Sequence, residues 1–455
     1  MTTILSLFPF LVSSFIGYFL IHFLDDDKKI PTSSRVLLGC GLGLGLSAYI
    51  TFFSFLIFDQ LNRLFIITIH LLLFLFLLRD HIVSQTKKTQ SGSFFKSFGA
   101  KDLVAVLTIL VCLLPTIYML FLYPEGGWDA WSVWNVKAKI LFLGQEHWKN
   151  IFLPVLWRTS PHYPLLLPLM NVWGWIFNSQ TGLMAPILLC LIFTILNISL
   201  LFYALKDRIR LWINLLISAL LLTLPFFYKF AASQYADIVV GFYLFASLYC
   251  LVQARMQSQK VFALLSGLFL GFLSFSKNEG LTAGLMILLL AIPYLQRKNS
   301  FDTKKILMPF LAGAFISFIP LMIFQTFYAP ANLTFINGFT SSIKPTGFSR
   351  LQVVLIFYLM LFKNLQWNGL WVMFVAGMIL GRNKILNRDM IIIPVFLMLY
   401  GGVVTFYYLL NTYFEIGWWM SETLHRILFS LLPTISYWIF LSLFSSRTAI
   451  DNSKP

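Results

Sequence analysis

The sequence predicts an all-α polytopic membrane protein with about thirteen transmembrane helices. Of its 455 residues, 59% are hydrophobic and only 11% are charged, and the mean hydropathy is +0.82. Soluble globular domains carry about 25% charged residues. Apolar runs long enough to cross a bilayer recur along the chain, whereas a transmembrane β-barrel would show segments of about ten residues with alternating polarity.

We expect residues 1–455 to form a single transmembrane domain. The predicted spans are 4–24, 35–58, 61–78, 102–122, 182–205, 211–228, 237–254, 261–276, 281–296, 306–328, 365–381, 389–410 and 427–445. The first run lacks a basic segment before it and a small-residue cleavage site after it, so we predict a retained helix and no signal peptide. Residues 163–178 are apolar but short and proline-containing, which predicts a re-entrant or interfacial helix.

The lysines and arginines indicate which ends of the spans face the cytoplasm. With 163–178 left out of the spans, most of the 33 basic residues fall on one side. The positive-inside rule makes that side cytoplasmic, with the N-terminus outside and the C-terminus inside. The net charge of +16 then reflects cytoplasmic loops, and we expect no nucleic acid partner. The four cysteines lie inside apolar runs, which argues against a disulfide framework or a zinc site.

Several acidic residues fall on the opposite, external side. They lie in short connections or at helix ends, mostly beside aromatic residues: Asp59, Glu125, Asp129, Glu146, Asp237, Glu279, Glu415 and Glu422. Ionisable groups at membrane depth are costly, so their default interpretation is functional. We therefore predict an active surface that faces the periplasm or the exterior, built from external loops at 123–180, 329–350 and 411–426.

The candidate site residues lie in four external segments, around "GGWDAWSVWNVKAK" to "RTSPHYPLLLP", "SQYADIVVG", "SFSKNEGL" and "EIGWWMSETLHR". In chain order they are Trp128, Asp129, Trp131, His162, Tyr163, Asp237, Lys277, Glu279, Glu422, His425 and Arg426. Most also have a structural interpretation. The tryptophans could form only an interfacial belt, and Arg426 could snorkel to the membrane surface. Lys277 and Glu279 could form a local ion pair, and Asp237 could cap a helix. Asp129 is the hardest to explain structurally, because the sequence around it offers no obvious ion-pair partner.

These segments also carry a family likeness. The run "GWDAWSVWNVKAKILF" with the later "SPHYPLLLPL" resembles the first external loop of the type C (GT-C) integral-membrane glycosyltransferases. It is most similar to bacterial relatives of protein O-mannosyltransferases and the aminoarabinose transferase, the family 39-like group. "QYADIVVGFY", "GFLSFSKNEGL" and "ETLHRILFSLLP" resemble later segments of that group. The turn His162-Tyr163-Pro164-Leu165 departs from the family's His-Pro-Pro-Leu at its second position. The likeness covers residues 102–285 and 410–435.

The resemblance implies a GT-C fold and a polyprenyl-phosphate-linked sugar as donor. The family's catalytic base falls on Asp129 and its second external acid on Asp237, which could also bind a divalent metal ion, since some members use one. The basic residue that meets the donor phosphate falls on Arg426. The acceptor would be a glycan, a lipid or a protein. The bacterial-type motifs and lysine-rich cytoplasmic loops favour the bacterial cytoplasmic membrane as the location.

The residues themselves suit this chemistry. A sugar phosphate has a good leaving group, so one carboxylate that accepts the proton of an acceptor hydroxyl suffices for a direct inverting displacement. Lys277 and Arg426 are the candidates to meet the negative charge on the leaving phosphate. Trp128, Trp131 and Trp134 offer flat apolar faces for a sugar, as does Tyr235. An amphipathic helix in residues 130–150 would lie at the headgroup level.

A transporter or flippase for a lipid-linked or ionic solute is the alternative function. A secondary transporter typically shows paired halves and binding groups near the middle of the membrane. The sequence shows no convincing internal repeat, and its acidic candidates gather at one face. The enzyme hypothesis requires Asp129, Lys277 and Arg426 to converge around one external cavity.

Overall fold

The computed structural model describes residues 2–25, 29–86, 100–296, 300–340, 347–381 and 389–444. Every regular element within these ranges is a helix. Many basic residues behind the predicted sidedness lie outside the described residues, at 26–28, 87–99, 297–299, 382–388 and 445–455. Residues 341–346 of the predicted external loop 329–350 also lie outside them.

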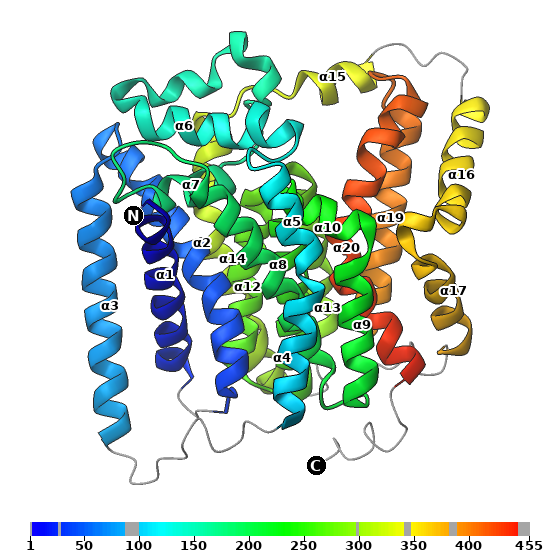
Figure 1. Ribbon diagram of the computed structural model, residues 1–455, viewed down its shortest axis with the longest axis horizontal. Helices are drawn as coiled ribbons and strands as arrows, with labels where there is room; N and C mark the ends of the chain where they lie inside the picture. The colour runs from blue at the N-terminus through cyan, green and yellow to red at the C-terminus, as the bar shows by residue number, and fades with distance from the viewer. Residues whose placement is uncertain are drawn as a thin grey trace.

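Among the described residues, ten helical stretches are long and apolar enough to cross a membrane, which confirms an all-α polytopic membrane protein. Nine are single helices: α1 (Thr2–Leu24), α2 (Thr32–Phe58), α3 (Arg63–Thr86), α8 (Met184–Leu205), α11 (Ala236–Gln257), α13 (Asn278–Leu295), α14 (Ser300–Phe327), α19 (Ile392–Leu410) and α20 (Ile416–Phe444). The tenth is α4 (Ala100–Cys112) continued by α5 (Leu114–Leu122). Most of them run side by side in Figure 1.

The predicted number of thirteen spans is not confirmed. The run 211–228 is two helices, α9 (Leu211–Thr223) and α10 (Pro225–Ala232), bent by 63°. The helix α12 (Lys260–Ser276) has 17 residues, which at 1.5 Å per residue falls short of a bilayer core of about 30 Å. The longest helix in the run 365–381 is α17 (Leu370–Leu380), which has 11 residues.

A helix that the sequence analysis left out precedes α17. It is α16 (Gly347–Lys363), and a short turn of 3₁₀-helix, η5 (Leu365–Trp367), connects the two. Figure 1 shows α16 and α17 one above the other at the edge of the bundle. Left-handed backbone at Asn368 and Gly369 separates them. The chain therefore passes this edge in two short helices, which a single hydropathy window does not detect.

The helix α11 lies at the centre of the bundle and is buried along almost its whole length. Helices α8, α12 and α20 pack against it. Small residues let the neighbouring helices approach closely: a Cβ added at Gly267 of α12 would lie 2.2 Å from the carbonyl oxygen of Phe310 in α14. Close approach through small residues is typical of helix packing in membranes. The first turn of α11, from Ala236 to Val239, is completely buried in the bundle.

Short helices cover one end of the bundle, which we call the loop end (top of Figure 1). They are η2 (Ala130–Trp134), α6 (Asn135–Leu143), η3 (Gln145–Phe152), η4 (Pro154–Thr159), α7 (Leu166–Gly174) and α15 (Leu333–Thr340). The segment 130–150 is thus a π-helical turn, an α-helix and a 3₁₀-helix in succession. Helix α7, within the predicted re-entrant segment, has only nine residues, all buried, so it is too short to span a bilayer.

Candidate functional site

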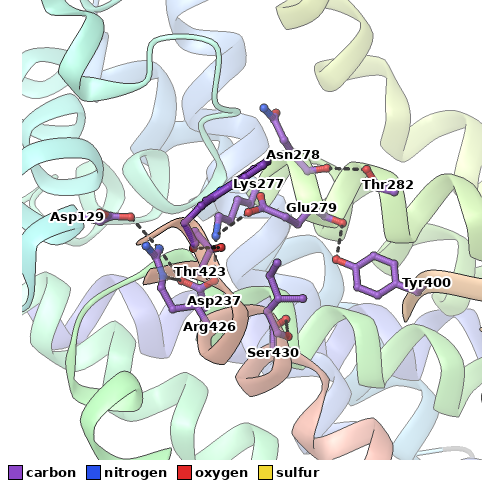
Figure 2. A network of polar contacts seen from close by, with 12 residues as sticks. Asp129, Asp237, Lys277, Asn278, Glu279, Thr282, Tyr400, Thr423, Arg426 and Ser430 are labelled. Atoms are coloured by element: carbon purple, nitrogen blue, oxygen red, sulfur yellow. Dashed lines mark hydrogen bonds and ion pairs between the residues drawn. The ribbon is translucent and has the colours of Figure 1, made fainter. Parts of the chain in front are cut away.

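Five charged residues from four separate segments meet at the loop end (Figure 2). Arg426 Nη2 lies 2.7 Å from Asp129 Oδ2 and 3.0 Å from Asp237 Oδ2. Lys277 Nζ lies 3.0 Å from Asp237 Oδ1 and 3.1 Å from Glu279 Oε1. The order is Asp129, Arg426, Asp237, Lys277 and Glu279, so negative and positive charges alternate. We call these five residues the charge chain.

The centre of the charge chain is buried and its two ends are open. The side chains of Asp237 and Lys277 are 3% and 6% exposed, whereas those of Asp129 and Glu279 are 21% and 31% exposed. Charges withdrawn from water must be paired, because an uncompensated buried charge is strongly destabilising. Three carboxylates and two cations give the cluster a formal charge of −1. A polar ligand can therefore reach Asp129 and Glu279 at the two ends. At the buried centre, Asp237 and Lys277 pair with each other.

Asp237 lies in the first turn of α11, where the helix macrodipole favours a negative charge. Its oxygens accept hydrogen bonds from Lys277 Nζ at 3.0 Å and from Arg426 Nη2 and Nε at 3.0 and 3.3 Å. The structure assigns no side-chain cap to this helix start. The interpretation of Asp237 as only a helix cap is therefore wrong, because both of its oxygens bind cations from other segments of the chain.

Lys277 is the single residue between α12 and α13, and its backbone is extended. The two helices cross closely because Gly280 has no side chain: a Cβ there would lie 2.2 Å from the carbonyl oxygen of Leu273. Burial by itself would lower the pKa of Lys277, but the carboxylates of Asp237 and Glu279 outweigh burial and raise it. Lys277 and Glu279 do form the local ion pair considered above, and the same ammonium also binds Asp237.

Arg426 lies in α20 and, like Lys277, joins two carboxylates. Its guanidinium lies over the ring of Tyr235, 4.4 Å from the ring centroid, in addition to its bonds to Asp129 and Asp237. Its side chain is only 15% exposed. The snorkelling interpretation of Arg426 is therefore wrong, since the guanidinium is turned into the protein and held on several sides.

Two glycines bring Asp129 to this position. Gly126 has φ 77°, and a Cβ there would lie 2.6 Å from the carbonyl oxygen of Ser233. A Cβ at Gly127 would lie 2.4 Å from Tyr235 Oη. The loop therefore docks on the segment before α11 only because both positions lack side chains. The π-helical turn η2 begins directly after Asp129, and such turns are frequent at functional sites.

The tryptophans of this loop differ in their surroundings. Trp128 and Trp131 are 63% and 47% exposed and contact each other edge to face, with ring centroids 4.4 Å apart. Trp134 is fully buried and stacks on Tyr163 with centroids 5.7 Å apart. The suggestion that Trp134 offers a face to a sugar is therefore wrong, and the face of Tyr235 over which Arg426 lies is occupied.

The sequence analysis missed Lys137, a buried lysine that binds the turn in which His162 and Tyr163 lie. Lys137 Nζ donates to the carbonyl oxygens of Ser160, at 2.6 Å, and Tyr163, at 3.4 Å. Burial lowers the pKa of Lys137 to about 7. Burial and the nearby Lys137 charge lower the pKa of His162 to about 4. His162 is therefore neutral at pH 7 and cannot supply positive charge to a phosphate. Burial raises the pKa of Tyr163 well above its usual value.

The remaining two candidates do not join the charge chain. Glu422 is exposed and lies one helical turn before Arg426. The ring of His425 stacks on Phe226, with centroids 4.3 Å apart, and its Nδ1 accepts a hydrogen bond from Trp367 Nε1 at 3.3 Å. His425 therefore belongs to an aromatic cluster between α10, η5 and α20.

The described residues offer no group of three or more His, Cys, Asp or Glu side chains arranged to hold a metal ion. Asp237, the residue considered for a divalent ion, has a cation on each of its two oxygens. A divalent metal at Asp237 would meet Lys277 and Arg426 at close range, and like charges repel strongly where water is excluded. The charge chain therefore does not fit a metal site.

No protein-family model matches the chain, and neither does any curated protein or solved structure. The resemblance to GT-C glycosyltransferases thus depends on short motifs. What the structure adds is that residues from four of these motifs, distant along the sequence, lie in contact at one end of the bundle.

Proposed function

We propose that the protein is a membrane glycosyltransferase that moves a sugar from a polyprenyl-phosphate carrier to an acceptor hydroxyl on the extracytoplasmic face. One observation carries the proposal: Asp129, a carboxylate at an open end of the charge chain, is held by Arg426, a guanidinium that can also bind phosphate. An arginine can bind two phosphate oxygens at once. The donor phosphate would replace Asp129 on Arg426 and release the carboxylate.

The released carboxylate can then act as general base. Asp129 accepts the proton of the acceptor hydroxyl while the hydroxyl oxygen attacks the anomeric carbon. The bond between that carbon and the phosphate oxygen breaks, and the phosphate leaves with the electron pair. Arg426 would stabilise the negative charge that develops on it, while Lys277 would stay bound to Asp237 and Glu279. The sugar is transferred in one displacement with inversion, and no covalent enzyme intermediate forms.

The surroundings suit a substrate that is part lipid and part sugar. Asp129 directly precedes η2 at the loop end, and its partner Arg426 belongs to a helix long and apolar enough to cross a membrane, so a polyprenyl tail can stay among lipids while its phosphate reaches the site. Trp128 and Trp131 expose aromatic surface beside Asp129, and aromatic faces pack well on the apolar faces of sugars. The acceptor would be a glycan, a lipid or a protein, and the location the bacterial cytoplasmic membrane.

The test is sugar transfer by the purified protein in lipid nanodiscs from polyprenyl-phosphate sugars. We expect Asp129→Asn to lower the rate of transfer by roughly 10²–10⁴-fold, the usual contribution of a general base. The matched control is Asp59→Asn, because Asp59 also lies at the loop end but binds Trp148 and Lys149 away from the charge chain. Equal rates for wild type and Asp129→Asn would remove Asp129 as the base. Movement of a lipid-linked solute across sealed vesicles without transfer would favour a transporter instead.

A further inference from the structure

Gln234 lies directly before Tyr235 and α11 in an unusual conformation. Its φ is 58°, in the left-handed region that residues other than glycine rarely adopt. Its side chain is almost completely buried, at 2% exposure. A strained backbone of this kind persists only where its surroundings enforce it, and it is often found at functional sites. The contacts of the side chain show what enforces it here.

The amide of Gln234 joins three segments of the chain. Its Nε2 donates to the carbonyl oxygen of Pro124 at 2.8 Å, and its Oε1 accepts from Asn135 Nδ2 at 2.9 Å. Asn135 Oδ1 accepts in turn from Asn171 Nδ2 at 3.0 Å. All three amide side chains are buried. We call Gln234, Asn135 and Asn171 the amide relay; it ties the loop before Asp129, the start of α6 and the buried helix α7 to one point.

The amide relay ties the chain just before Asp129 to the residues just before α11, so it joins the segments of the two carboxylates that bind Arg426. Next to it, the backbone N–H of Gly127 donates to the carbonyl oxygen of Ser233 at 2.9 Å. Asp129 follows Gly127 by two residues, and Asp237 follows Tyr235 by two residues. The docking of one segment on the other therefore sets the separation of the two carboxylates, whereas Arg426 comes from a different helix.

We infer that Gln234 is a positioning residue, which through the amide relay fixes the segment that carries Asp129 relative to Arg426 and Asp237, so that the carboxylate stays in place for catalysis once the donor has released it from Arg426. This inference rests on the proposed function and adds to it the hydrogen bonds that position the base. A misplacement of about 1 Å in a reacting group lowers a rate by roughly 10²-fold. Loss of the relay should therefore slow the chemical step more than it weakens donor binding, because Arg426 and Lys277 remain bound to Asp237.

The experiment compares Gln234→Gly with Gln145→Gly. Gln145 also has a positive φ, 49°, and lies at the loop end, but its side chain is exposed. Glycine suits the backbone at both positions, so the variants differ in whether a buried amide is lost. The readouts are kcat and donor KM for sugar transfer, thermal unfolding, and the rate at which a water-soluble carbodiimide labels Asp129 and Asp59, measured by mass spectrometry.

For Gln234→Gly we expect kcat to fall roughly 10–100-fold with donor KM unchanged, and the labelling rate of Asp129 to change while that of Asp59 does not. For Gln145→Gly we expect no change in any readout. A purely structural role would lower the unfolding temperature and the amount of active protein without altering the labelling of folded Asp129, and that result would overturn the inference.

The labelling measurement needs no substrate, so it separates the two proposals. If the wild type transfers no sugar but Gln234→Gly still alters the labelling of Asp129 alone, the proposed function fails and the positioning of Asp129 by Gln234 stands. If transfer occurs and Gln234→Gly matches wild type in kcat and labelling, the proposed function stands and the inference about Gln234 fails.

Discussion

Substitution of Arg426 tests most directly whether the ion pairs of the charge chain stabilise the fold and depend on one another. Arg426→Met leaves Asp129 and Asp237, which bind the same guanidinium nitrogen, without the cation between them. Asp237 keeps Lys277, whereas Asp129 loses its ion-pair partner. Breaking a buried ion pair from one side costs about 3–5 kcal/mol. Because Asp129 is 21% exposed and partly solvated, we expect a value near the lower end, about 3 kcal/mol.

The Asp237→Asn variant should cost less. It leaves two carboxylates and two cations, so the pairs between Arg426 and Asp129 and between Lys277 and Glu279 remain. The double variant lacks both charges of the pair between Arg426 and Asp237. Asp129 then no longer faces a second carboxylate. We therefore expect the double variant to be more stable than the sum of the single effects predicts, with a coupling energy of about 1–3 kcal/mol.

Thermal unfolding of the purified protein in detergent, followed by tryptophan fluorescence, measures these effects. For a chain of 455 residues, an unfolding entropy of about 2.1 cal/mol/K per residue converts 3 kcal/mol into a fall of about 3 °C in Tm. Arg426→Lys is the control, because it keeps the charge but cannot bind two groups with a planar fork. Strict additivity of Arg426→Met and Asp237→Asn would refute the idea that Arg426 and Asp237 act as a pair.

Two further predictions concern stability elsewhere in the chain. Burial lowers the pKa of Lys137 from its usual 10.5 to about 7, so between these pH values the unfolded chain binds more protons and stability rises with pH. Thermal unfolding should therefore show wild type gaining stability relative to Lys137→Met as the pH rises from about 6 to about 9; a pH-independent difference would contradict this. At Gly43 a Cβ would lie 1.7 Å from the carbonyl oxygen of Ser13, so Gly43→Ala should destabilise the contact of α1 with α2 by about 1–3 kcal/mol. Gly401→Ala, where a Cβ meets nothing within 4 Å, should leave the Tm unchanged or raise it slightly; an equal loss for both would contradict the packing argument.

The sequence was sufficient for the fold class because hydropathy is a local property. It was insufficient for the number of spans, because short helices join in ways that depend on distant neighbours. The break before Pro225 bends α9 and α10 by 63°, and a hydropathy window averages across it. Within residues 347–380 the sequence predicted a span over α17 but not over α16, where Arg350 and Lys363 leave only the twelve residues 351–362 between them. In the structure Arg350 is buried and donates to the carbonyl oxygens of Tyr408 and Asn411.

The candidate site was predictable to the extent that charge in an apolar chain stands out. Asp129, Asp237 and Arg426 were all identified this way, but their pairing was not, because their contacts join residues far apart in sequence. Gln234 was missed since its partners are a backbone carbonyl and another amide, and neutral amides give no charge signal. The burial of the tryptophans depends on their surroundings in the fold. Nothing in the motif "WDAWSVW" shows that Trp134 is buried and that Trp128 and Trp131 are exposed.

The geometry also distinguishes between the two open ends of the charge chain. Asp129 and Glu279 are both partly exposed, and each pairs with one cation. Lys277, the partner of Glu279, is 6% exposed and shared with Asp237, so a phosphate cannot reach it without breaking the buried centre. Arg426 is more exposed and offers a planar fork. A phosphate would therefore enter on the side of Arg426 and displace Asp129 while Glu279 stays on Lys277. For that reason the base is expected at Asp129, the end where the incoming donor itself releases the carboxylate.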